Sequence, residues 1–256
     1  MRIGILAALA VAQLCAQRST PDYTQSTIVH GATDAPGPLA PNTLATIYGV
    51  NLSANTRALQ TSDIKGNAMP VTLPGSGTHV LISGINAPIY YASPTQIKFL
   101  VPPNLLPGST RLTVVVDGIS GREARVQIAP VSPAFFLTSP GLPAAVDLDG
   151  EVITAAHRVS AGEWAILYAT GLGDTVPRAI SGQLVKQPTP LAALVTVLLD
   201  GVPADINYAG LAPGYVGLYQ INVMVPLGTS DLPEIRLDVD GALSPEGVFL
   251  PVRKPE

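Results

Sequence analysis

The sequence predicts an all-β fold of two similar antiparallel β-sandwiches in tandem, and three observations lead to this prediction. Several short segments are rich in β-branched residues and bounded by Gly, Pro or Asp, namely residues 111–116, 194–199 and 220–225. The hairpin dipeptide Asp-Gly occurs four times, at 117–118, 149–150, 200–201 and 240–241. After the N-terminal apolar run, no stretch of about 12 or more residues keeps the 3.6-residue apolar period of a helix.

An internal repeat predicts that the two sandwiches arose by duplication. Residues 39–52 resemble residues 159–172, so that Tyr48 corresponds to Tyr168, 120 residues later. Three further pairs match in the same order: 80–84 with 197–201, 89–92 with 206–209, and 96–102 with 220–226. The offset rises from 117 to 124 between the last two pairs, which places a seven-residue insertion within residues 210–219. Strands at this spacing, in copies of roughly 100 residues, are typical of the immunoglobulin type of sandwich.

The N-terminus has the pattern of a secretory signal peptide: Arg2, an apolar run over residues 3–12, and Ala16 before a polar segment. We expect a signal peptide over 1–16, a linker over 17–25, a first sandwich over 26–138 and a second over 139–256. The protein is therefore expected to be secreted or extracytoplasmic, with the cell surface as one possible location. No membrane span is expected in the mature chain.

Cys15 is the only cysteine, so the chain cannot form an intrachain disulfide. A lipid-modified Cys15 is an alternative to cleavage after Ala16. Leu14 argues against this alternative, because a lipoprotein signal carries a small residue at that position.

Residues 208–226 closely resemble the hallmark of the Solibacter-type uncharacterised C-terminal domain; they read Tyr-Ala-Gly-Leu-Ala-Pro-Gly-Tyr-Val-Gly-Leu-Tyr-Gln-Ile-Asn-Val-Met-Val-Pro. Residues 165–173 and 91–102 look like two further motifs of this family, and the resemblance covers about residues 26–252. Residues 43–52 are similar to the opening strands of IPT/TIG immunoglobulin-like domains. The resemblance implies a module of secreted proteins, and it implies no activity or catalytic residues.

Composition excludes two broad classes of protein. Hydrophobic residues make up 47% of the chain and charged residues 12%, which is too apolar for a disordered chain. The net charge of −4 argues against a nucleic-acid partner, because such proteins are basic.

The sequence predicts no catalytic or metal-binding motif. His30, His79 and His157 have no His, Cys or acidic neighbour at metal-ligand spacing. The segment 147–151 resembles the start of a calcium loop but lacks its later ligands, so we interpret it as a hairpin turn. Neither a nucleophile elbow nor a phosphate loop is present. We therefore expect no catalytic, cofactor-binding or metal-binding residues, no cofactor and no enzymatic activity.

Aromatic residues are sparse, and their positions suggest where the protein makes contacts. Tyr48, Trp164, Tyr168 and Tyr208 lie in repeat-matched strand segments, so we predict that they belong to the core. Tyr90 and Tyr215 are predicted to be exposed.

The inserted segment is the candidate functional region. Its apolar side chains are unusual on an exposed loop, so we expect another part of the protein or a partner to cover them. Leu211, Tyr215 and Val216 form the candidate contact patch for a partner. The alternative is that the segment folds onto its own sandwich or wedges against the first one.

The leading functional hypothesis is a secreted, non-enzymatic module for adhesion, display or assembly, whose partner is an extracellular protein or polysaccharide not identified by the sequence. The first alternative is an extracellular glycan-binding module. The second is a hydrolase with an unrecognised site, which a cleft with two acidic residues or a His near a Ser would favour.

Overall fold

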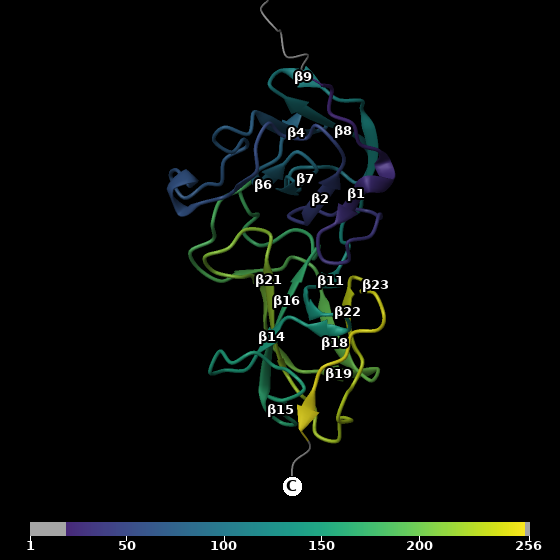
Figure 1. Cartoon of the computed structure of the whole chain (residues 1–256). Coiled ribbons are helices and arrows are strands. Elements are labelled where there is room, and N and C mark those ends of the chain that lie inside the picture. The colour runs from purple at the N-terminus through teal and green to yellow at the C-terminus, as the bar shows by residue number, and fades with distance from the viewer. Residues whose placement is uncertain (1–18, 254–256) are drawn as a thin grey trace, which may run out of the picture.

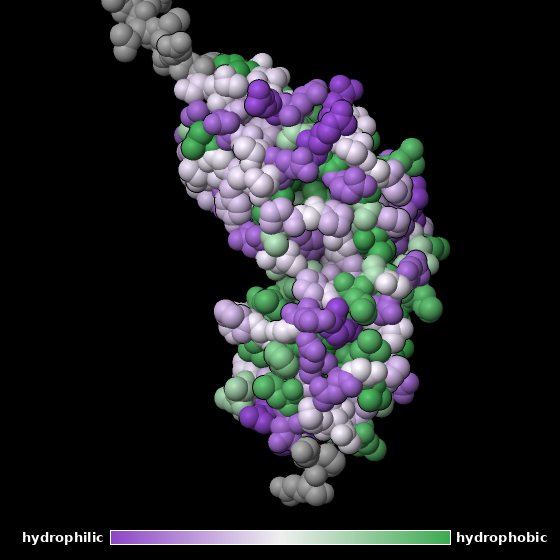
Figure 2. Space-filling model, turned by 90° about the vertical axis from the view of Figure 1, so that its right-hand side faces the viewer, coloured by the Kyte–Doolittle hydropathy of each residue, from purple (hydrophilic) through white to green (hydrophobic). Residues whose placement is uncertain are grey.

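The computed structural model describes residues 19–253, so the predicted signal peptide over 1–16 and Cys15 lie outside the described residues. The chain forms two β-sandwiches stacked end to end, with β9 (Ile119–Ser120) near one end and β24 (Val252–Arg253) at the other (Figure 1). Figure 2, a side view, shows an indentation of the surface where the two sandwiches meet. Within residues 19–253, no helix has the length and apolar character needed to cross a membrane.

The first sandwich consists of two antiparallel sheets and two short 3-10 turns. The first sheet has the order β1 (Ile28–His30), β2 (Leu44–Tyr48), β7 (Gln96–Leu100), β6 (Ile89–Ser93), β3 (Arg57–Ala58). The second has the order β10 (Ala124–Ile128), β8 (Gly108–Val116), β4 (Thr78–Ile82), β5 (Ile85–Asn86), and β9 pairs with β8. The 3-10 turns are η1 (Gln25–Thr27) and η2 (Thr61–Asp63).

The second sandwich repeats this arrangement. Its first sheet has the order β11 (Ala134–Phe135), β16 (Trp164–Thr170), β21 (Tyr219–Met224), β20 (Ile206–Leu211), β17 (Thr189–Pro190), and β14 (Ala145–Val146) also pairs with β16. Its second sheet has the order β19 (Val202–Ala204), β18 (Val195–Leu199), β22 (Ile235–Val239), β23 (Ala242–Leu243). Two small ladders complete it: β12 (Leu137–Ser139) with β13 (Leu142–Pro143), and β15 (Val159–Ser160) with the parallel β24.

The pairing register repeats between the two sandwiches, as the duplication predicts. Tyr48 pairs with Gln96 on β2 and β7, and Tyr168 pairs with Gln220 on β16 and β21. Strands β6 and β20 each contain a register shift at the corresponding place. The structure therefore confirms an all-β fold of two tandem sandwiches with the predicted correspondence of strands.

Each sandwich encloses its own hydrophobic core. Ile47 belongs to the first core and Leu167 to the second, and both side chains are fully buried. The chain passes from the first core to the second between Ile128 and Phe135. The second sandwich therefore begins before the predicted boundary at 138/139, because β11 already pairs with β16 of that sandwich. The division into domains at 26–138 and 139–256 stays a prediction.

The prediction that four strand aromatics lie in the core is wrong. Tyr48 is 37% exposed, and Trp164, Tyr168 and Tyr208 are only half-buried. Successive side chains of a strand point to opposite faces of the sheet. Because Leu167 points into the core, its neighbour Tyr168 must point outward.

Candidate functional site

The inserted segment forms the loop 212–218 between β20 and β21. Leu211, at the end of β20, is 2% exposed and packs in the second core. Val216 is half-buried, whereas Tyr215 is 57% exposed. Of the three residues of the candidate contact patch, the structure therefore brings Tyr215 and Val216 to the surface and buries Leu211. Tyr90, which we also expected to be exposed, is half-buried.

The base of this loop packs against the first sandwich. The Thr170 hydroxyl donates a hydrogen bond to the Gly217 carbonyl over 2.9 Å and accepts one from the Leu44 amide over 3.1 Å. Gly217 has a φ of +68°, and a Cβ there would lie 2.5 Å from Leu100 Cδ1 and 2.9 Å from the Asn42 carbonyl oxygen. Only glycine fits this contact without displacement of a neighbour.

Further hydrogen bonds join the two sandwiches on other sides of the junction. Asn67 Nδ2 donates to the Leu184 carbonyl over 2.6 Å, and the Leu184 amide donates to the Asn67 carbonyl over 2.9 Å. His30 Nε2 lies 3.0 Å from the Ser132 carbonyl oxygen. These contacts hold the sandwiches in one relative orientation.

His30 also lines a groove of about 710 Å³ between the sandwiches, together with Ser132 and Glu246. Its Nδ1 accepts a hydrogen bond from the Ala32 amide, and its Nε2 faces the Ser132 carbonyl rather than the Ser132 hydroxyl. Burial of the imidazole holds the pKa of His30 below its ordinary value. With both nitrogens bound to main-chain groups, the ring has no free position from which to accept a proton from a serine hydroxyl.

The outward side of the sheet β16-β21-β20 carries a group of half-buried side chains, of which Trp164, Tyr168 and Tyr208 were predicted to lie in the core. From β16 and β21 they are Trp164, Ile166, Tyr168, Gln220, Asn222 and Met224, and from β20 Tyr208. The alternation of buried and half-buried residues along each strand shows that they share one face. Burial, and secondarily the nearby phenol of Tyr215, raise the pKa of Tyr168.

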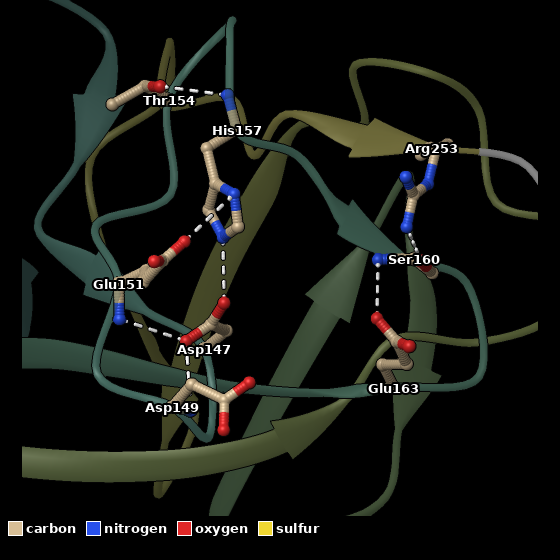
Figure 3. A network of polar contacts seen from close by, with 8 residues as sticks. All are labelled: Asp147, Asp149, Glu151, Thr154, His157, Ser160, Glu163 and Arg253. Carbon is tan, nitrogen blue, oxygen red and sulfur yellow. Dashed lines mark hydrogen bonds and ion pairs between the residues drawn. The ribbon is translucent and has the colours of Figure 1, made fainter.

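His157 is not isolated, contrary to the expectation from the sequence. Asp147 Oδ2 lies 2.7 Å from His157 Nε2, and Glu151 Oε2 lies 3.4 Å from His157 Nδ1 (Figure 3). Asp147 Oδ1 accepts hydrogen bonds from the amides of Asp149 and Glu151, which close the predicted hairpin turn. The hydrogen bond to His157 is the main cause that holds the pKa of Asp147 below its ordinary value.

The three side chains supply donor atoms within 4.8 Å of one another, which is the spacing of metal ligands. In the structure, however, the two carboxylates lie at opposite nitrogens of one imidazole (Figure 3). A single metal ion binds a histidine through one nitrogen only. The arrangement found is therefore a network of polar contacts around the ring.

We expect the substitution His157→Ala to raise the pKa of Asp147, because it removes the hydrogen bond that contributes most to lowering it. A lowered carboxyl pKa contributes stability that is present above the pKa of the unfolded chain and lost as the pH falls through the folded-state pKa. The variant should accordingly lose less stability on acidification than the natural protein. NMR titration of the Asp147 carboxyl carbon measures the shift, with His79→Ala as the control. An unchanged Asp147 pKa in His157→Ala would contradict this prediction.

The fold and this geometry define an immunoglobulin-like protein of two β-sandwiches. Residues 33–129, which span most of the first sandwich, match the IPT/TIG domain family. No curated protein matches the chain.

Several solved structures are similar to the chain over most of its length. One is SGBP-B of the Bacteroides ovatus mixed-linkage glucan utilization locus in complex with a mixed-linkage heptasaccharide, at 13% identity over 91% of this chain and 45% of that one, with a TM-score of 0.37. Another is the plexin A4 extracellular region, at 14% identity over 94% of this chain and 16% of that one, with a TM-score of 0.29. A third is invasin, a bacterial integrin-binding protein, at 15% identity over 86% of this chain and 37% of that one, with a TM-score of 0.24. The chain spans less than half the length of each of these three proteins.

Proposed function

We propose that this protein is a secreted, non-enzymatic module of adhesion, display or assembly, and that the loop 212–218 makes contact with its extracellular partner. The observation that carries the proposal is the exposed ring of Tyr215 on a loop that is anchored at both ends. The Ala212 amide bonds to the Leu218 carbonyl over 2.9 Å, and the Gly214 amide to the Val185 carbonyl over 2.7 Å. An aromatic side chain on a rigid support loses little conformational entropy on binding, which favours it as an anchor.

Two further observations support this proposal. The resemblance of residues 208–226 to the Solibacter-type C-terminal domain supports a place among modules of secreted proteins. The main-chain contacts of both His30 nitrogens argue against the use of this histidine as a general base. In this proposal Leu211 supports the contact patch from the core, while Tyr215 and Val216 form its surface.

We expect Tyr215→Ala to weaken capture of the extracellular partner by about tenfold or more, since an exposed aromatic anchor is removed. The melting temperature should stay the same, because Tyr215 is 57% exposed and supports no core. The measurement is a pull-down from the culture medium of the producing cells, quantified against the natural protein. Tyr48→Ala, a partly exposed tyrosine of the first sandwich, is the matched control.

Undiminished capture by Tyr215→Ala would contradict the proposed role of the loop. A large fall in melting temperature would instead show that Tyr215 supports the junction between the sandwiches.

A further inference from the structure

The outward side of the sheet β16-β21-β20 presents two aromatic rings along one strand. We call the set Trp164, Tyr168, Tyr208, Tyr215, Gln220 and Asn222 the aromatic face. Trp164 and Tyr168 lie on the same side of β16, four residues apart, which corresponds to about 13 Å along the strand. Tyr215 lies close enough to Tyr168 for the two phenols to interact electrostatically, so it extends the face beyond the end of the strand.

Two amide side chains lie beside these rings and are held in a defined orientation. Gln220 is paired directly with Tyr168, and Asn222 lies between Ile166 and Tyr208. Gln220 Nε2 donates a 2.8 Å hydrogen bond to Asn222 Oδ1. This bond uses neither the Gln220 carbonyl, which can accept a hydrogen bond from a ligand, nor the two N–H groups of the Asn222 amide, which can donate to one.

The aromatic face carries no charged side chain on β16, β20 or β21. The corresponding face of the first sandwich differs, because Lys98 on β7 pairs there with a buried Thr46. An uncharged ligand therefore suits these three strands, since their side chains offer a polyanion or polycation no ion pair.

Aromatic rings and oriented amide side chains on uncharged strands favour a sugar as the ligand. The C–H-rich faces of a sugar ring stack on aromatic side chains, and neighbouring hydroxyls on the sugar exchange hydrogen bonds with a carboxamide. Two rings about 13 Å apart along one strand fit an extended, ribbon-like chain better than a compact ligand.

We propose that the aromatic face binds a neutral, β-linked glucan chain, with sugar rings stacked on Trp164 and Tyr168 and hydroxyls bound by Gln220 and Asn222. This inference rests on the proposed function of the protein as an extracellular binding module. It adds the chemical class of the ligand and a surface wider than the loop 212–218.

The protein contains a single tryptophan, and this residue is Trp164, so its intrinsic fluorescence reports on the aromatic face directly. Titration with hydroxyethylcellulose, a soluble neutral β-glucan, should shift or quench this fluorescence. The same polymer in a native gel should retard the protein, whereas the anionic polygalacturonate should not. Tyr168→Ala should weaken the retardation by about tenfold or more, because a ring that the ligand covers is lost.

Matched variants separate loss of the face from loss of the fold. Tyr168→Phe keeps the ring and should bind like the natural protein, and Tyr48→Ala removes the corresponding tyrosine of the first sandwich and should also bind normally. Gln220→Glu preserves size but adds a charge, and it should weaken binding. The melting temperature of each variant shows whether it folds.

The proposal is overturned if hydroxyethylcellulose does not retard the natural protein, or retards it without any change in Trp164 fluorescence. Equal retardation of folded Tyr168→Ala and natural protein would also overturn it. If the chain captures an extracellular protein in a Tyr215-dependent manner and binds no glucan, the proposed function stands and this inference alone fails.

Discussion

The substitution Leu167→Ala is expected to lower the free energy of unfolding of the second sandwich by about 2–5 kcal/mol. Leu167 lies at the centre of β16, is fully buried and belongs to the second core. Its truncation removes buried apolar surface and leaves a cavity that a close-packed sandwich fills only in part. Denaturant unfolding monitored by Trp164 fluorescence measures the change, since this residue lies on the same strand.

Leu194→Ala is the matched control for this experiment, because Leu194 belongs to the same sandwich and is 77% exposed. It should change the stability by no more than about 0.5 kcal/mol. Similar losses in the two variants would mean that Leu167 does not pack in the core as described.

The substitution Gly217→Ala is expected to open the junction between the sandwiches and to cost about 2–4 kcal/mol. Gly217 has a φ of +68°, which is unfavourable for alanine, and the added Cβ would lie 2.5 Å from Leu100 Cδ1 and 2.9 Å from the Asn42 carbonyl oxygen. The loop must then move away from the first sandwich, which also breaks the hydrogen bond from Thr170. Small-angle X-ray scattering should show a larger radius of gyration, and thermal unfolding should show the loss of stability.

Gly214→Ala provides a control within the same loop. Gly214 has a φ of +86°, but an added Cβ there meets no atom within 4 Å. It should cost only the backbone strain, about 1 kcal/mol, and should leave the radius of gyration unchanged. Equal effects of the two glycine variants would show that the contact with Leu100 does not hold the junction.

Local patterns were sufficient to predict the all-β fold and its duplication. The correspondence of Tyr48 with Tyr168 followed from the repeat alone, and the structure pairs them with Gln96 and Gln220 in the same register. Such patterns succeed because strand length, turn residues and apolar spacing are properties of neighbouring residues. The insertion was found in the same way, since it changes the offset between matched strands.

The sequence also contains the information on which face of a sheet each strand residue lies, although our prediction for the aromatic residues is wrong. Once Leu167 is taken to point inward, the two-residue period of a strand places Trp164 and Tyr168 on the opposite side. The place of these aromatic residues in repeat-matched strand segments led us to predict that they lie in the core, but the alternation of side chains along the strand decides on which face each one lies.

Other features depend on contacts between residues far apart in the chain, and only the tertiary structure decided them. Thr170 connects Gly217 and Leu44, which lies 126 residues from Thr170, and no local pattern indicates this contact. The ring of His157 meets Asp147 and Glu151 because the hairpin between β14 and β15 folds back on itself. The fold of each sandwich thus follows from the periodicity of its own strands, whereas the junction and the surfaces depend on how distant segments pack, and that packing is set by shape and hydrogen bonding in three dimensions.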